Sequence, residues 1–225
     1  MEYNLNLGNM NRLENLIKQY IGRMDDVFDD VKKQVTHYQY GTGDEFVHLG
    51  FYCPSIIADK VYGNVNRGKI LKSKSPKRFS FKYGLDDNDK VLTVEGAFFK
   101  EFVMSDGNSQ IGIRFCKNDT SYLISSSEYD EEGRIKAYRE LGYISLLKKI
   151  LYYKDETYKY NEKILNVLET RVDLDFYRIS NHTLVQEDGI WYPVEYKQID
   201  AGKRADRQTG DGSVSDSQIH KNDKE

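Results

Sequence analysis

The segment Gln110-Ile111-Gly112-Ile113-Arg114-Phe115 alternates apolar residues with polar or small ones along its whole length. A period of two places the apolar side chains on one face of a β-strand and the others on the opposite face. The same alternation recurs between clusters of Gly, Asn, Asp and Ser at residues 77–83, 91–95, 134–138 and 172–176. This pattern predicts consecutive antiparallel strands with one face in water.

A weak internal repeat supports hairpins between these strands. Leu85-Asp86-Asp87-Asn88-Asp89-Lys90-Val91 is echoed by Tyr129-Asp130-Glu131-Glu132-Gly133-Arg134-Ile135. Asp, Asn and Gly tolerate the left-handed backbone of tight turns, and the basic and β-branched residues that follow suit a returning strand. The repeats are spaced too irregularly for a propeller or solenoid, so we predict a meander.

The chain opens with a different period. Between residues 9 and 38 the apolar residues are spaced three or four apart, as on one stripe of a helix. They are Met10, Leu13, Leu16, Ile17, Tyr20, Ile21, Met24, Val27, Phe28, Val31, Val35 and Tyr38. The stripe predicts one long helix with Gly22 as a tolerated weak point.

These patterns predict an α+β fold in which the long N-terminal helix packs against a curved, mostly antiparallel, half-barrel-like β-meander of roughly eight to ten strands. We expect one domain over residues 1–200, with the helix at 9–38 and the meander at 45–199. Residues 144–153 and 162–171 fit either strands or short helices. Residues 201–225 hold few apolar side chains and are expected to be a disordered tail.

Composition excludes several classes of protein. Of 225 residues, 39% are hydrophobic, which is enough for a core and excludes disorder of the whole chain. No apolar run reaches the roughly 18 residues of a membrane span. The first residues show no basic segment followed by an apolar one, so no secretory signal is expected and the predicted compartment is the cytoplasm.

Several short motifs resemble catalytic or metal-binding strings without their required companions. Asp25-Asp26-Val27-Phe28-Asp29 matches a D-D-x-x-D diphosphate motif, but no second acidic helix faces it. Ser145-Leu146-Leu147-Lys148 matches S-x-x-K, but its partner motifs are missing. We therefore expect no catalytic residue, no metal and no cofactor. A pairing of Cys53 or Cys116 with a histidine such as His48 or His182 stays open, because proximity in the fold cannot be read from the sequence.

Two charged stretches are the candidate partner-binding sites. Between Asp59 and Asp86 every charged residue is basic, although the whole chain has a net charge of −3. The basic candidates are Lys69, Lys72, Lys74, Lys77, Arg78 and Lys82; the acidic ones are Asp130, Glu131 and Glu132. The basic stretch fits a solvated strand edge, a patch for an acidic protein, or a nucleic-acid surface, the last disfavoured by a pI near 5.9.

Residues 129–135 resemble the Y-D-x-x-G-[RK]-[LI] hairpin unit of YD/RHS-type proteins, which also occurs in bacterial immunity proteins encoded beside secreted toxins. Asp188-Gly189-Ile190-Trp191-Tyr192-Pro193 is similar to a strand of lipoprotein-carrier-like half-barrels. The first resemblance implies a hairpin-rich binding protein, and the second implies a curled sheet that wraps a helix.

The leading functional hypothesis is a non-catalytic cytosolic bacterial protein that binds another protein, with a toxin-neutralising immunity protein as the specific case. Many tyrosines and charges of both signs suit protein recognition. The alternatives are a small-molecule or lipid carrier, which requires an apolar cavity between helix and sheet, and an enzyme whose site is assembled from distant residues.

Overall fold

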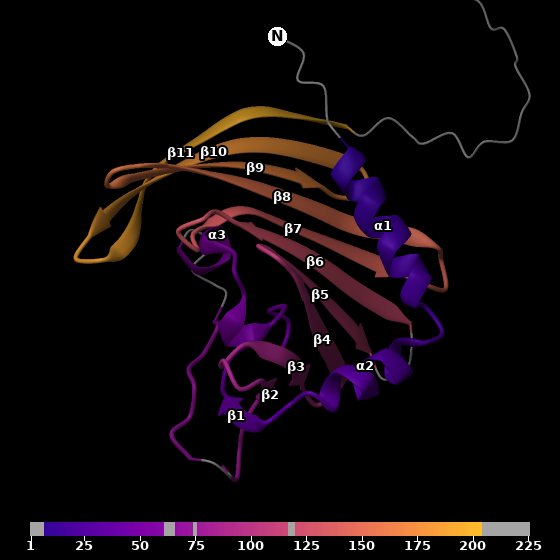
Figure 1. The fold of residues 1–225 in the computed structure, drawn as a ribbon. Helices are drawn as coiled ribbons and strands as arrows, with labels where there is room; N and C mark the ends of the chain where they lie inside the picture. The colour runs from indigo at the N-terminus through magenta and orange to yellow at the C-terminus, as the bar shows by residue number, and fades with distance from the viewer. Residues whose placement is uncertain (1–6, 61–65, 74–75, 117–119, 204–225) are drawn as a thin grey trace, which may run out of the picture.

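The computed structural model describes residues 7–60, 66–73, 76–116 and 120–203. Within these ranges, eleven antiparallel strands form one open sheet in which each strand pairs with its neighbours in sequence (Figure 1). The strands are β1 (His37–Gly41), β2 (Phe81–Leu85), β3 (Val91–Glu95), β4 (Phe99–Asp106), β5 (Ser109–Cys116), β6 (Ser121–Tyr129), β7 (Ile135–Ile144), β8 (Lys149–Asn161), β9 (Ile164–Val172), β10 (Phe176–Glu187) and β11 (Ile190–Lys203). The predicted antiparallel meander is therefore confirmed, with more strands than expected.

The repeated turn sequences form equivalent hairpins. In the turn after β2, the Asp86 carboxylate accepts hydrogen bonds from the backbone N–H groups of Asn88 and Lys90. In the turn after β6, Asp130 accepts the corresponding bonds from Glu132 and Arg134. The residue before the returning basic position has positive φ in both, +59° at Asp89 and +75° at Gly133, as such turns require.

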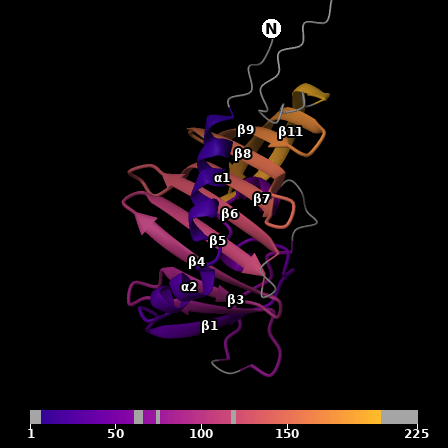
Figure 2. The ribbon, with the colours of Figure 1, turned by 90° about the vertical axis from the view of Figure 1, so that its right-hand side faces the viewer.

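The prediction of one helix over residues 9–38 is wrong. The structure has two helices, α1 (Gly8–Tyr20) and α2 (Met24–Lys32), separated by a break at Gly22, where φ is +83°. α1 lies across β6 and β7 while α2 lies on β3 and β4, so the bend lets both helices follow the curved sheet (Figure 2). The last residues of the predicted helix belong instead to β1.

Other boundaries also differ from the predictions. Residues 144–153 and 162–171 form parts of β7, β8 and β9, together with their turns, rather than short helices. Residues 172–176, predicted to be a strand, are mostly the turn between β9 and β10. Residues 201–203 complete β11, so they are not part of a tail, and residues 204–225 lie outside the described residues.

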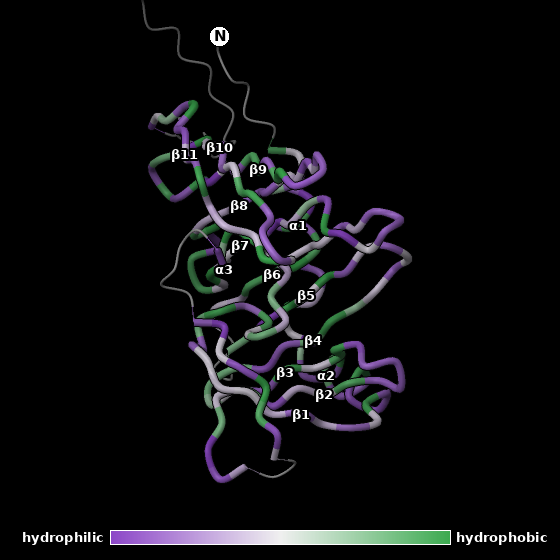
Figure 3. The backbone as a smooth tube through the Cα atoms, turned by 90° about the vertical axis from the view of Figure 1, so that its left-hand side faces the viewer, coloured by the Kyte–Doolittle hydropathy of each residue, from purple (hydrophilic) through white to green (hydrophobic). Residues whose placement is uncertain are grey.

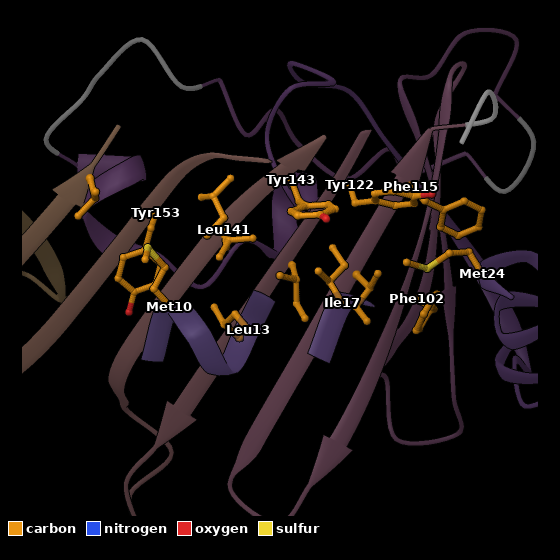
Figure 4. Packing of buried hydrophobic residues seen from close by; sticks show 14 of the residues in the cluster. Met10, Leu13, Ile17, Met24, Phe102, Phe115, Tyr122, Leu141, Tyr143 and Tyr153 are labelled. Carbon is orange, nitrogen blue, oxygen red and sulfur yellow. The ribbon is translucent and has the colours of Figure 1, made fainter. Parts of the chain in front are cut away.

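One face of the sheet, the helix face, is covered by α1 and α2. Met10, Leu13 and Ile17 of α1 pack on aromatic and aliphatic side chains of the strands (Figure 4). The strand residues of this cluster are Phe102, Ile113, Phe115, Tyr122, Ile124, Leu141, Tyr143, Ile150, Tyr153 and Val172. Large side chains thus fill the space between α1 and the described strands, which counts against the cavity required of a carrier.

The opposite face, the loop face, is covered by an irregular stretch that we call the covering segment, residues 44–60. It includes the short helices η1 (Gly50–Tyr52) and α3 (Ile56–Lys60). Figure 1 shows the sheet bending around the side that carries α3, and Figure 3 views the molecule from that side. Leu49 packs on residues of β2–β4, whereas Cys53 and Ile57 pack on residues of β7–β10. None of the described helices is long and apolar enough to cross a membrane.

Candidate functional site

The predicted basic residues lie beside the edge strand β1 and on β2. Lys69, Lys72, Lys77 and Arg78 are exposed, and Lys74 lies outside the described residues. Lys82 is engaged, because its ammonium group lies 3.5 Å from a carboxylate oxygen of Glu95 and 4.1 Å from the centre of the Tyr38 ring.

The predicted acidic residues form the turn between β6 and β7, several strands away from the basic stretch. Asp130 closes that turn and pairs with Arg134 at 2.8 Å, and Glu132 pairs with the same guanidinium group at 2.8 Å. The structure therefore does not bring the acidic and basic candidates together. Arg134 offsets one of the three negative charges of this turn.

The loop face carries a buried polar cluster that the sequence analysis missed. Glu101 of β4 and Arg114 of β5 are opposite one another in the sheet and form an ion pair that is almost wholly buried. The guanidinium group also donates to the backbone carbonyls of Glu45 and Val47, each at 2.7 Å. Glu101 in turn accepts from the backbone N–H of Leu49 at 2.9 Å.

Within this cluster, Glu101, His48 and Ser125 are arranged as an acid, a base and a hydroxyl group. His48 Nε2 lies 2.8 Å from Ser125 Oγ, and His48 Nδ1 lies 3.4 Å from a Glu101 carboxylate oxygen. Burial lowers the pKa of His48, so the neutral imidazole that can accept a serine proton is favoured. Residues of these three types underlie nucleophilic catalysis in many hydrolases, in which the acid accepts a hydrogen bond from Nδ1 of the histidine. Among the described residues, His48 Nδ1 has no hydrogen-bond partner, so this link is not made here.

The trio is closed off in this conformation. Glu101, Ser125 and His48 expose 0%, 1% and 3% of their surfaces, so no substrate atom can reach the hydroxyl oxygen unless the covering segment moves. Leu49, next to His48, has a φ of +59°, which a branched apolar residue rarely adopts. The covering segment is thus held in place with local backbone strain.

A second group of ionisable residues, in which Glu140 and Lys154 are half-buried and Glu156 is buried, lies further along the loop face. Burial works to raise the pKa of Glu140, but the charge of Lys154 and hydrogen bonds from two tyrosines outweigh it and lower that pKa to about 2. Glu156 lies 3.3 Å from the Lys154 ammonium group. In its case burial outweighs the favourable partners and raises the pKa.

Polar side chains on the loop face of the sheet also hydrogen-bond to the covering segment. The N–H of Phe51 donates to the Tyr83 hydroxyl at 3.0 Å, and the N–H of Ile56 donates to the Tyr158 hydroxyl at 3.1 Å. Ser55 donates to Glu156 at 2.8 Å and accepts from the N–H of Ala58 in α3. Buried backbone groups need such partners, so the side chains of the sheet supply what regular secondary structure would otherwise provide. The cluster fixes the covering segment to the sheet.

Within the described residues, no hydrogen bond joins Cys53 or Cys116 to a histidine. Cys53 is buried, burial raises the pKa of its thiol, and Cys116 Sγ lies 3.1 Å from Ser121 Oγ. Among the residues that the structure describes, no group of three or more His, Cys, Asp or Glu side chains is arranged to hold a metal ion.

The two edges of the sheet differ. Residues 66–71, which we call the edge strap, run beside β1 and hydrogen-bond to it. The backbone N–H of Leu71 donates to the carbonyl oxygen of Tyr40 at 2.7 Å, and the N–H of Thr42 donates to the carbonyl oxygen of Lys69 at 3.0 Å. β11 is the last strand at the other edge, and within the described ranges no strand pairs with its outer side. It is also the longest strand, with 14 residues.

β11 exposes apolar side chains along its length. The exposed fractions are 45% for Ile190, 45% for Tyr192, 59% for Val194 and 52% for Tyr196. Trp191 packs beside Tyr160 at the start of the strand, and two register shifts relative to β10 interrupt its pairing. The alternation of apolar and polar residues predicts strands but not their order in the sheet. It therefore does not show which strand lies at the open edge.

Comparison of the chain with protein-family models, with curated proteins and with solved structures gives no match.

Proposed function

We propose that this chain is a non-catalytic protein-binding module that recognises an extended segment of a partner protein through the outer edge of β11. The observation that carries the proposal is the contrast between the two edges. The β1 edge is covered by the edge strap, whereas the long β11 edge carries exposed aromatic and aliphatic side chains. Proteins commonly protect such an edge, and an open one is a template for adding a strand.

The side chains of β11 suit this role. Tyr192 and Val194 offer apolar contact area, which drives association, and tyrosine is enriched at interfaces. Pro193 lacks an N–H group, and the bulges of β11 break the ladder, so an added strand can pair only in a restricted register. These features favour one specific partner strand over unselective sheet-to-sheet pairing.

The test is to select displayed peptides that bind the full chain and to measure their affinity for variants. We expect the selected peptides to alternate apolar and polar residues, because an added strand places every second side chain on the face that carries Tyr192. The double variant Tyr192→Lys/Val194→Lys should weaken binding at least about tenfold. The matched control is Phe46→Lys, which introduces the same charge at an exposed apolar side chain outside β11. Phe46 is 89% exposed. Equal weakening by both variants would count against a β11 site.

The finer proposal is that the partner is a toxin that this chain neutralises. It rests on the similarity of residues 129–135 to YD-type hairpins, whose turn geometry is present after both β2 and β6. The test is to identify the gene beside that of this chain and to co-express its product. A toxic neighbour whose toxicity is relieved by this chain, and not by the double variant, supports the proposal. If the natural chain and the double variant relieve the toxicity equally, the toxin contact lies outside Tyr192 and Val194.

A second candidate function is hydrolysis by acyl transfer, and the observation favouring it is the contact of Ser125 with His48 at 2.8 Å. In that reaction His48 would take the proton of Ser125 while Glu101 stabilises the imidazolium that forms. It requires the covering segment to open. A fluorophosphonate probe decides the question: labelling that disappears in Ser125→Ala supports a hydrolase, and no labelling at long incubation supports a structural trio.

A further inference from the structure

A row of basic side chains runs across β8, β9 and β10 on the loop face, towards the β11 edge. Lys154 of β8 is directly opposite Arg171 of β9, and Arg171 is directly opposite Arg178 of β10. Paired residues of neighbouring strands point to the same face, and like charges placed opposite one another are unfavourable. Lys154 is compensated by Glu140 and Glu156. The Arg171 guanidinium group lies 3.5 Å from the Asp173 carboxylate.

The two arginines line a pocket of about 550 Å³ that is formed by the ends of β9, β10 and β11. Its other walls are Asp173, Phe176, Tyr177 and residues 201–203, so Lys203 adds a third positive charge. The Asp173 carboxylate lies 3.5 Å from the Arg171 guanidinium group and is the one acidic side chain among the described lining residues. These described residues therefore carry a net charge of +2, in a chain whose net charge is −3.

The pocket also has an apolar wall. Phe176 is 56% exposed although it is a large aromatic residue at the start of a strand. It lies opposite Lys203 in the sheet, and Arg178 lies opposite Ala201. The volume is within the range of small-molecule sites, in which a few polar groups orient a ligand against apolar walls.

We propose that this pocket binds a small organic phosphate, with the phosphoryl group between Arg171 and Arg178 and the organic part against Phe176. Guanidinium groups bind phosphate oxygens through two parallel N–H donors, which makes arginine the preferred residue for such anions. The pocket shares residues 201–203 with the end of β11, but it includes neither Tyr192 and Val194 of the proposed docking edge nor the buried trio.

The experiment is calorimetric titration of the full chain with inorganic phosphate and with phenyl phosphate, against chloride at matched ionic strength. We expect saturable binding of both, tighter for phenyl phosphate. Arg171→Gln and Arg178→Gln should each weaken binding at least about tenfold. Phe176→Ala should remove the advantage of phenyl phosphate and leave the affinity for inorganic phosphate unchanged.

The matched control is Arg134→Gln, which neutralises an exposed arginine in the turn between β6 and β7. Thermal unfolding of each variant without ligand identifies loss of folding, and Arg178→Lys, which keeps the charge but loses the planar fork, should bind more weakly than the natural chain. The proposal is overturned if the natural chain shows no saturable binding of either phosphate, or if Arg134→Gln weakens binding as much as the pocket variants.

Discussion

Arg114 is the residue on which the buried cluster depends most. It neutralises Glu101 and satisfies two carbonyl groups of the covering segment. Arg114→Met would leave the Glu101 carboxylate buried without a cation, and breaking a buried pair in this way costs about 3–5 kcal/mol of unfolding free energy. Urea denaturation of the variant and the natural chain measures this loss.

The matched control is Arg134→Met, which breaks an exposed pair with Asp130 and Glu132 and should cost far less. The double variant Glu101→Gln/Arg114→Met should recover part of the loss, because no uncompensated charge remains. Equal losses in the buried and exposed variants would contradict the assigned role of Arg114.

Glu140 should make stability dependent on pH in the acidic range. Because its pKa in the folded chain is lowered to about 2, its contribution is present above the pKa of an unfolded Glu and is lost as the pH falls towards 2. At pH 7, Glu140→Gln should therefore reduce the unfolding free energy by about 2–3 kcal/mol. The difference between variant and natural chain should shrink between about pH 5 and pH 2.

Glu156 provides the opposite sign as a control. Its pKa is raised, so its favourable contribution is present below the pKa of an unfolded Glu and is lost as the pH rises through its folded pKa. Glu156→Gln should thus cost less than Glu140→Gln at pH 7. Denaturation curves at several pH values test both statements, and a pH-independent difference for Glu140→Gln would contradict the first.

Among the elements, the break between α1 and α2 is set by Gly22. Its φ is +83° and a Cβ atom there would meet nothing within 4 Å, so Gly22→Ala should cost only the conformational penalty of about 1–2 kcal/mol. Gly68 in the edge strap also has positive φ, but a Cβ atom there would lie 1.7 Å from the carbonyl oxygen of Thr42. Gly68→Ala should lower the thermal midpoint much more than Gly22→Ala, and equal shifts would contradict this.

The alternation of apolar residues was a good guide where one face of a strand is wet. Residues 134–138, for example, are predicted to be a strand and fall at the start of β7, where Lys136 is exposed between the buried Ile135 and Ala137. The prediction of one long helix was wrong because the spacing of apolar residues continues past Gly22 whether or not the helix axis bends there. Residues 144–153 stayed ambiguous because both faces of the sheet are covered in the middle, which replaces alternation by apolar runs such as Ile150-Leu151-Tyr152-Tyr153.

The buried cluster could not be predicted from the sequence. Glu101 and Ser125 meet His48 only because β4 and β6 lie beneath the covering segment, at separations of 52 or more residues. One signal was present: Arg114 is a charged residue between Ile113 and Phe115, both of which are buried. The basic and acidic candidate sites could be proposed from the sequence because their charged residues are close together along the chain. Such proximity does not show which residues surround them in the fold.

At the scale of the whole molecule, the covering segment should behave as part of the rigid body. Its amides donate to acceptors on the sheet, including the Tyr158 hydroxyl that accepts from Ile56. In native-state hydrogen–deuterium exchange, Tyr158→Phe should therefore speed exchange at Ile56 while the amides of β5 remain protected. Fast exchange throughout the covering segment of the natural chain would contradict a fixed segment and would favour the hydrolase alternative.

We propose the open edge of the sheet as the partner-binding surface, because the other edge and both faces of the sheet's centre are covered within the described chain. The most direct measurement is hydrogen–deuterium exchange of the full chain with and without a peptide selected for binding. The account predicts new protection confined to β11, at residues 190–203, and its loss in Tyr192→Lys/Val194→Lys. Protection elsewhere, with β11 unchanged, would contradict it.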